Sequence, residues 1–159
     1  MAAASGVVLA IDAGTTGVRT RAVYADGRPS IAEYREFAQH YPQPGWVEHD
    51  AEEIWQSVRA TLQSVCSRVN EPIAAIGITN QRETVVAIDR RTGAPLHRAI
   101  VWQDRRTAAR CDELAPHLGV VRDTTGLVLD PYFSGSKVEW LLRNTEVAKN
   151  PNVAFATID

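Results

Sequence analysis

Residues 12–19 combine several groups that bind phosphate in proteins. Gly14 and Gly17 allow positive φ and close backbone approach, so that successive N–H groups of a turn can converge on an anion. Thr15 and Thr16 add hydroxyl donors, and Asp12 can hold a divalent cation directly or through water. This pattern predicts a phosphate-binding turn. An ordinary hairpin with a Gly-Thr turn remains the alternative, because short Gly-rich matches are weakly specific.

A second polar cluster, Asn-Gln-Arg-Glu at residues 80–83, directly follows an apolar run. Ligands in open α/β sheets bind beyond the carboxyl ends of strands, where this cluster is expected to lie. Arg82 can donate in a fork while Glu83 accepts, a pairing that suits a small ligand with several hydroxyl groups. A purely structural ion pair between Arg82 and Glu83 is the alternative interpretation.

Two aromatic residues are candidates for the wall of such a pocket. Trp102 ends a short apolar run and can lay its ring on the carbon skeleton of a ligand. Tyr132 lies in the loop at residues 126–136 and carries a hydroxyl group that can reach a small ligand. Burial in the core is the alternative for both side chains.

The elements that must position these groups read as an α/β domain. The run at residues 73–79 is nearly continuously apolar, which is typical of a strand buried on both faces. Gly77 within this run suggests that another element approaches it closely. Apolar runs and alternating patterns predict strands at residues 7–11, 18–24, 30–37, 73–79, 84–89 and 99–102.

Three helices are predicted from capping signals. Asp50 and Glu53 form a capping-box pattern, and an apolar stripe follows at helical spacing, formed by Ile54, Val58, Leu62, Val65 and Val69. Asp104 is the predicted N-cap of a second helix. Ser136 and Glu139 form the predicted capping box of a third.

Composition excludes several classes of protein. A chain of 159 residues with 45% hydrophobic and 23% charged residues is typical of a globular domain. The net charge of −2 provides no basic field for nucleic acid or an anionic membrane. No apolar run approaches the roughly 20 residues of a membrane span, and residues 1–5 lack the features of a signal peptide. Cys66 and Cys111 are expected to be reduced thiols in a cytoplasmic protein.

Five motifs occur in the chain in a recognisable order: DAGTT, YPQPGWVEHD, GITNQRET, AIVWQDRRT and DPYFSGSK. This combination resembles the N-terminal portion of the glycerol kinases of the FGGY carbohydrate kinase family, within the actin-like, ribonuclease-H-like ATPase superfamily. The resemblance covers residues 7–159. It implies an α/β fold with a mixed sheet flanked by helices, in which this chain is a truncated first kinase domain and the second domain is absent.

The resemblance also implies an activity, the transfer of the γ-phosphoryl group of ATP to glycerol with the help of Mg²⁺. Asp12 matches the acidic residue near the magnesium ion. Thr15, Thr16 and Gly17 match the loop that holds the nucleotide phosphates, with Arg19 beside them. The matched glycerol-pocket residues are Arg82, Glu83, Trp102 and Tyr132, with Thr15 also on the substrate side.

The same resemblance sets expectations for what this chain lacks. The family's catalytic base, an Asp, is expected beyond Asp159, so the 159 residues alone are expected to lack efficient turnover. The full-length enzyme is expected to form a cytoplasmic dimer or tetramer, without a nucleic acid partner or a membrane span.

The hairpin departs from the usual glycerol kinase pattern. Those enzymes commonly have Asp-Gln-Gly-Thr-Thr-Ser-Ser-Arg, whereas Ala13, Gly17 and Val18 here lack the corresponding polar side chains. Phosphate binding is therefore expected to be retained, with its strength in question. Two other functions stay open: a family kinase that acts on a different polyol or sugar, and a non-catalytic, actin-like nucleotide-binding module.

Overall fold

The computed structural model describes residues 6–159 and divides the chain into two compact units. The first unit contains the described chain up to Ala38, together with Glu52–Gln81 and Asp159. The second contains Gln39–Ala51 and Arg82–Ile158. Residues 1–5, on which the signal-peptide prediction depends, lie outside the described part. Across residues 6–159, no helix has the length and apolar character that crossing a bilayer requires.

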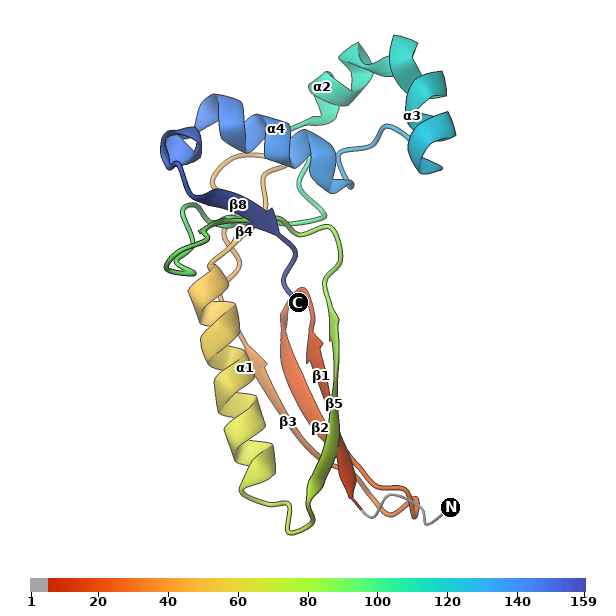
Figure 1. Cartoon of the computed structure of the whole chain (residues 1–159), viewed down its shortest axis with the longest axis vertical. Coiled ribbons are helices and arrows are strands. Elements are labelled where there is room, and N and C mark those ends of the chain that lie inside the picture. The colour runs from red at the N-terminus through yellow and green to blue at the C-terminus, as the bar shows by residue number, and fades with distance from the viewer. Residues whose placement is uncertain (1–5) are drawn as a thin grey trace. The chain divides into compact units, whose positions relative to one another are not determined.

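The first unit is built on a four-stranded mixed sheet with the strand order β3-β2-β1-β5 (Figure 1). The strands β1 (Val7–Ala13), β2 (Gly17–Val23) and β3 (Ile31–Glu36) form an antiparallel meander. The fourth strand, β5 (Ile73–Asn80), runs parallel to β1. A parallel pair needs a long crossover, and here the crossover includes helix α1 (Ala51–Cys66). The predicted mixed sheet and its helix are thus confirmed.

Helix α1 covers one face of this sheet. Side chains of β1 alternate between buried and exposed, as expected for a strand with one covered face. The helix buries Ile54, Ser57, Thr61 and Val65, whereas Val58 of the predicted stripe is only half-buried. The core of this unit consists of Val7, Leu9, Ala22 and Val65. The predicted apolar stripe was therefore partly wrong, because two of the buried positions carry hydroxyl groups.

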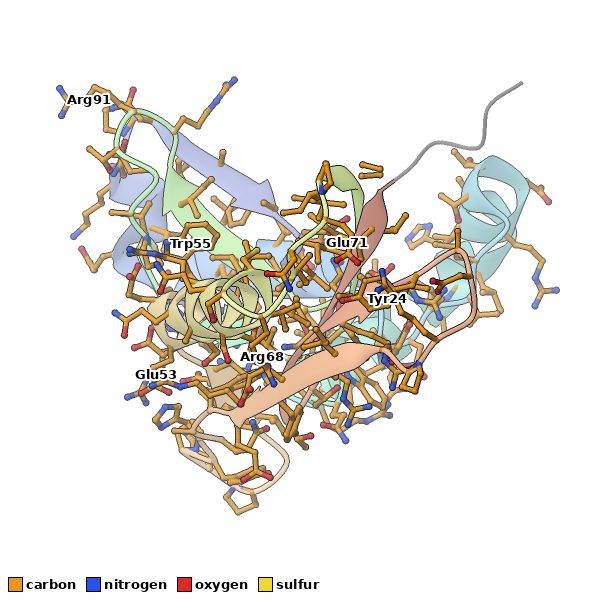
Figure 2. The ribbon with its side chains drawn as sticks, turned by 90° about the horizontal axis from the view of Figure 1, so that it is seen from below. Tyr24, Glu53, Trp55, Arg68, Glu71 and Arg91 are labelled. Atoms are coloured by element: carbon orange, nitrogen blue, oxygen red, sulfur yellow. The ribbon has the colours of Figure 1, made fainter. Side chains whose placement is uncertain are left out.

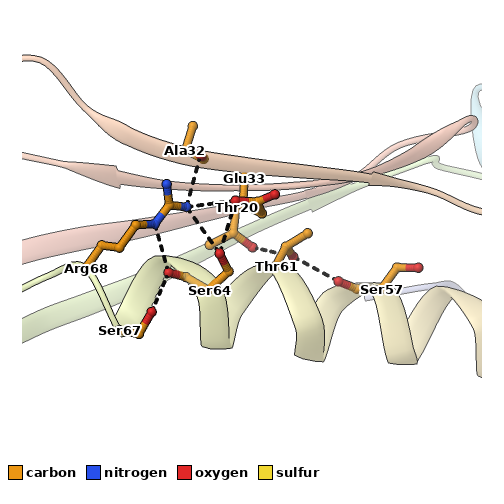
Figure 3. Close-up of polar contacts among 8 residues, drawn as sticks. All are labelled: Thr20, Ala32, Glu33, Ser57, Thr61, Ser64, Ser67 and Arg68. Carbon is orange, nitrogen blue, oxygen red and sulfur yellow. Dashed lines mark hydrogen bonds and ion pairs between the residues drawn. The ribbon is translucent and has the colours of Figure 1, made fainter.

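Hydrogen bonds explain why hydroxyl groups are tolerated beneath α1 (Figure 3). Thr61 Oγ1 donates to the Ser57 carbonyl at 2.9 Å and can therefore accept from Thr20 Oγ1, which also lies 2.9 Å away. Glu33 on β3 accepts from Ser64 Oγ at 3.0 Å and from Arg68 Nη2 at 2.9 Å. The buried hydroxyl groups of Thr20 and Thr61 are paired with each other, so their burial carries little penalty.

The two sides of α1 differ in character (Figure 2). Arg68 lies between α1 and β3, whereas Trp55 is 55% exposed on the helix surface turned away from the sheet. Beyond β2, the guanidinium carbon of Arg28 lies 3.7 Å from the centre of the Tyr24 ring, and Arg28 also bonds Glu71. The hydrogen bond from Arg28 lowers the pKa of Glu71. These contacts fasten the β2–β3 loop to the segment that precedes β5.

The burial predicted for β5 is wrong. Its side chains are exposed, including Ile73, Ile76 and Ile78, which are 46%, 54% and 61% exposed. Within the described residues β5 pairs only with β1 and forms the edge of the sheet. A Cβ atom built on Gly77 would meet nothing within 4 Å, so the expected close neighbour is absent from this part of the chain too. An apolar run indicates side chains that are favourably buried, but it does not show which segment buries them.

The second unit combines short strands with several helices. Strand β4 (Glu48–His49) pairs with β7 (Ala99–Ile100), and β6 (Val86–Asp89) pairs with β8 (Val153–Ala156). Its core consists of Val85, Ala87, Ile100, Leu141 and Val147. The helices are α2 (Ala108–Glu113), α3 (Leu118–Thr125) and α4 (Ser134–Asn144), with 3-10 turns at Ala115–His117 and Glu146–Lys149. The sequence analysis did not predict α3, which ends at Gly126 with φ of 73°.

Two predicted helix caps in this unit are wrong. Helix α2 begins at Ala108, and the Asp104 carboxylate instead accepts from the backbone N–H groups of Val47 at 2.6 Å and Arg106 at 2.8 Å. Helix α4 begins at Ser134, two residues before the predicted capping serine. Ser136 Oγ lies 2.8 Å from Thr107 Oγ1. In both cases contacts with residues distant in sequence replaced the local cap.

A buried arginine connects several segments of the second unit. The Arg106 side chain is fully buried and pairs with Glu48 at 2.9 Å and with Asp104 at 2.8 Å. Its guanidinium carbon lies against two indole rings, 3.9 Å from the centre of Trp46 and 4.6 Å from that of Trp140. Both carboxylates are almost completely buried, so the charge of Arg106 is required to compensate them.

Candidate functional site

The predicted phosphate-binding residues lie at the β1–β2 hairpin of the first unit. Asp12 on β1 is directly opposite Arg19 on β2 in the strand register, and both residues are exposed. Neighbouring residues Ile11 and Ala13 are buried, so Asp12 and Arg19 belong to the open face of the hairpin. Thr15 and Thr16 occupy the turn between the strands. An acidic group, a basic group and two hydroxyl groups thus share one end of the sheet.

Gln81, a residue that the sequence analysis did not select, fixes the shape of this turn. It directly follows β5, and its side chain is buried. Its backbone N–H donates to the Ala13 carbonyl at 2.9 Å, and its Nε2 donates to the Gly14 carbonyl at 3.2 Å. The position of an amide side chain at a strand end was the available signal, but the partner became clear only from the parallel pairing of β5 with β1.

Gly14 and Gly17 allow positive φ, as expected for glycine, but neither adopts it in this hairpin. Gly17 is required for a different reason: a Cβ atom there would lie 2.6 Å from both the Arg35 carbonyl oxygen and the Tyr34 hydroxyl. Its lack of a side chain therefore makes room for β3. Val18, the neighbouring departure from the usual pattern, is completely buried. Both differences from the usual glycerol kinase pattern thus serve the packing of this hairpin.

The donor set of the hairpin fits a magnesium ion that is bound mainly through phosphate and water. Within residues 6–159, no group of three or more His, Cys, Asp or Glu side chains could hold a metal ion alone. Mg²⁺ commonly keeps several waters and uses one or two carboxylates together with substrate phosphates. The exposed carboxylate of Asp12 can supply one such ligand. Arg19 lies over the Tyr34 ring, 5.3 Å from its centre.

The second unit brings three of the four predicted polyol-binding residues together. The Trp102 and Tyr132 rings meet edge to face with their centres 6.0 Å apart. Trp102 is tied to the residue that follows Glu83, because its backbone N–H donates to Thr84 Oγ1 at 3.3 Å. Glu83 and Tyr132 are joined through Lys137, whose Nζ donates to the backbone carbonyls of both residues.

Glu83 has an uncommon backbone conformation, with φ of 63°. Its carboxylate accepts hydrogen bonds from the backbone N–H of Ser134 at 2.8 Å and from Ser134 Oγ at 2.6 Å. Ser134 is the first residue of α4, so Glu83 satisfies a free N–H at the helix N-terminus and places its charge at the positive end of the helix dipole.

Arg82 does not share these contacts. It is exposed, and within the described residues no ion pair joins it to Glu83. The alternative of a structural Arg82–Glu83 pair is therefore wrong. The guanidinium group stays available to a ligand, whereas Glu83 is held by α4.

Lys137 is a second residue that the sequence analysis missed. It is completely buried, and burial lowers the pKa of its ammonium group to about 8, while Glu83, Asp104 and Asp130 oppose that shift. Lys137 ends the DPYFSGSK motif, but the motif does not indicate that the side chain is buried, because a lysine on a helix usually points to solvent. Only its carbonyl partners reveal its place.

A cavity of about 420 Å³ in the second unit is separate from these residues. Its lining is mainly apolar and includes Leu114, Val121, Leu127 and Phe133, contributed by α2, α3 and the loop before α4. None of the predicted site residues lines it. An apolar lining does not suit a triol, so this cavity does not match the polyol pocket that the resemblance implies.

Comparisons with known proteins agree with this geometry. Residues 7–159 match the model of the FGGY family of carbohydrate kinases, N-terminal domain. Glycerol kinase from Rhizobium meliloti (strain 1021) is 53% identical over 166 residues, covering 97% of this chain and 33% of the relative. The crystal structure of Plasmodium falciparum glycerol kinase with ADP has a TM-score of 0.87 at 30% identity, with 97% of this chain and 33% of that chain covered.

The fold is shared more widely than the sequence. Ligand-bound xylulose kinase from Lactobacillus acidophilus has a TM-score of 0.87 at only 19% identity, with 96% of this chain and 31% of that chain covered. The chain spans about a third of the length of the proteins it matches. The actin-like α/β fold and the family match over nearly the whole chain lead to one conclusion: this chain belongs to the FGGY family of carbohydrate kinases, in its N-terminal domain.

Proposed function

We propose that this chain is the N-terminal part of a glycerol kinase, which transfers the γ-phosphoryl group of ATP to a terminal hydroxyl of glycerol and yields glycerol 3-phosphate. The observation that carries the proposal is the grouping of Glu83, Trp102 and Tyr132 in one unit, linked through Lys137 and Thr84. The 53% identity with the Rhizobium meliloti glycerol kinase supports the same substrate.

The chemistry of this group suits a small triol. Both hydrogen bonds from Ser134 reach Oε2 of Glu83, which leaves Oε1 to accept a hydrogen bond from a ligand hydroxyl. The exposed guanidinium of Arg82 donates to hydroxyl oxygens, and the indole of Trp102 packs against carbon atoms. A charged acceptor, a charged donor and an apolar wall together recognise a short polyol.

The hairpin of the first unit supplies the phosphate side of the proposal. Backbone N–H groups and the hydroxyls of Thr15 and Thr16 bind phosphate oxygens, and Arg19 offsets their negative charge. Asp12 would hold Mg²⁺, which neutralises charge on the transferred phosphoryl group when it is bound. Phosphoryl transfer depends mainly on positioning and charge compensation, and these residues provide both.

Steady-state kinetics of the full-length protein test the proposal. ADP release would be measured by a coupled assay with glycerol and, separately, with a pentulose such as xylulose. We expect kcat/KM to favour glycerol by at least about tenfold, since a site built to bond particular hydroxyls discriminates well. A preference for the pentulose would contradict the proposal and indicate a kinase of the same family with a different substrate.

Two further functions make different predictions. A family kinase for another sugar shares the fold, as the likeness to xylulose kinase illustrates, but glycerol would then compete poorly for the pocket. A nucleotide-binding module without catalysis would bind ATP and turn over no polyol in the same assay. The catalytic base beyond Asp159, the oligomeric state, the cytoplasmic location and the inactivity of the 159 residues alone stay predictions.

A further inference from the structure

The first turn of α4 holds two proposed polyol-binding residues at once. Ser134 and Lys137 are three residues apart, so they share one side of the helix. Ser134 binds the carboxylate of Glu83 through its backbone N–H and its hydroxyl. Lys137 binds the backbone of the same residue, with Nζ 2.9 Å from the Glu83 carbonyl oxygen. Both the main chain and the side chain of Glu83 are therefore attached to α4.

The conformation of Glu83 requires such attachment. Non-glycine residues rarely adopt the left-handed region, and glutamate gains no local hydrogen bond there as asparagine or aspartate can. In the part of the chain that the structure describes, Glu83 is the only non-glycine residue with positive φ. Such a conformation persists only where the surrounding contacts impose it, and the bonds from Ser134 and Lys137 provide that constraint.

Tyr132 is constrained by the same lysine. Lys137 Nζ donates to its carbonyl, and Asp130 Oδ1 accepts from its backbone N–H at 2.7 Å. The Tyr132 ring then packs on Trp102. One ammonium group thus joins the backbone of the acceptor Glu83 to the backbone of the aromatic wall.

We propose that Lys137, together with Ser134, is a positioning residue that fixes Glu83 and Tyr132 in the geometry required to bind the polyol. The identity of the bound polyol rests on the proposed function. The positioning of Glu83 and Tyr132 by Lys137 and Ser134 does not. Lys137 does not touch the polyol in this account. It acts through two carbonyl oxygens, so its loss disturbs the binding of glycerol and leaves the nucleotide hairpin unchanged.

The main test is Lys137→Met in the full-length enzyme, since methionine is also long and unbranched but provides no donor. Lys149→Met is the matched control, because the Lys149 side chain is 78% exposed and, within the described residues, its ion pair is with Glu146, three residues earlier. We expect the KM for glycerol to rise about tenfold or more in Lys137→Met, with the KM for ATP within about twofold of the wild type. Equal rises in both constants, or none, would overturn the inference.

A milder variant covers the case in which Lys137→Met does not fold. Ser134→Ala keeps the backbone donor and removes one of the two bonds to the Glu83 carboxylate. We expect the KM for glycerol to rise by roughly threefold to tenfold and the KM for ATP to stay unchanged. An unchanged KM for glycerol in Ser134→Ala would contradict the positioning role of this helix turn.

The pH profile gives a readout that a merely structural lysine would not change. The ammonium group faces Glu83, Asp104, Asp130 and Cys111, and its pKa is lowered to about 8 by burial. Above that pH the neutral amine donates weaker hydrogen bonds, so the KM for glycerol should rise in the wild type. That inflection should be absent in Lys137→Met, whereas its persistence would assign the inflection to another group.

Hydrogen exchange separates this inference from the proposed function. In the wild type without any substrate, the Ser134 and Phe133 amides are held by Glu83 and Asp130. We expect Lys137→Met to speed amide exchange of residues 132–135 by about tenfold or more, and Lys149→Met to leave it unchanged. This result stands even if glycerol proves not to be the substrate. Unchanged exchange would overturn the inference while leaving the kinase proposal intact.

Discussion

Gly17→Ser is the most informative change to the hairpin, because it introduces the residue that glycerol kinases commonly have there. A Cβ atom at this position would lie 2.6 Å from the Arg35 carbonyl oxygen and equally close to the Tyr34 hydroxyl. The hydroxyl can swing away with its ring, whereas the carbonyl belongs to β3 and moves only with the strand. Overpacking of this kind typically costs about 1–3 kcal/mol. We therefore expect a loss of stability of that size.

Urea unfolding of the full-length protein measures this cost, with the free energy of unfolding taken from the linear extrapolation. Gly119→Ala is the matched control, because Gly119 lies in α3 and a Cβ atom there would meet nothing within 4 Å. Replacing a helical glycine by alanine stabilises a protein by roughly 0.5–1 kcal/mol. The two substitutions should therefore shift the unfolding midpoint in opposite directions.

A second readout addresses phosphate binding. If the glycine serves the packing of β3, the added serine should not lower the KM for ATP. The reasoning would be refuted if Gly17→Ser were as stable as the wild type and used ATP at lower concentration. Such a result would mean that the missing hydroxyl had weakened phosphate binding.

Four other substitutions test separate parts of the account in the full-length enzyme. Arg82→Ala or Glu83→Ala should raise the KM for glycerol strongly, since each lost charge-assisted hydrogen bond costs roughly 1.5–3 kcal/mol, and an unchanged KM in both variants would remove these residues from the pocket. Thr15→Val should weaken the use of ATP more than the binding of glycerol, whereas equal losses would indicate general misfolding. Arg106→Met should destabilise the protein in thermal melting by about 3–5 kcal/mol, because two buried carboxylates lose their partner, and a melting temperature like that of the wild type would contradict this.

Elements that are determined by neighbouring residues in the sequence could be predicted from it. The β1–β2 hairpin follows from two apolar strands around a Gly-Thr turn, and α1 begins next to Asp50 as its capping signal indicates. Three residues selected for the polyol pocket lie in one unit although they are distant in sequence. Lys137 joins the backbones of Glu83 and Tyr132, and the Tyr132 ring packs on Trp102, while their binding of a polyol stays a prediction. That selection came from a family resemblance, and spacing alone would have left each residue with a structural alternative.

What the sequence could not predict depends on tertiary partners. The caps at Asp104 and Ser136 were replaced by bonds to Val47 and Thr107, which no local pattern reveals. The burial of Lys137 depends on two carbonyl groups presented by separate loops. The wrong prediction for β5 has a different cause. Its apolar residues were identified correctly, but the prediction assumed that another element buries them.

The most direct test of the central claim is a crystal structure of the full-length protein with glycerol and a non-hydrolysable ATP analogue. The account predicts a glycerol hydroxyl within hydrogen-bonding distance of the Glu83 carboxylate, the carbon chain against the Trp102 ring, and nucleotide phosphates at Thr15 and Thr16. Glycerol bound away from Glu83 and Trp102, with the hairpin free of phosphate, would contradict the account.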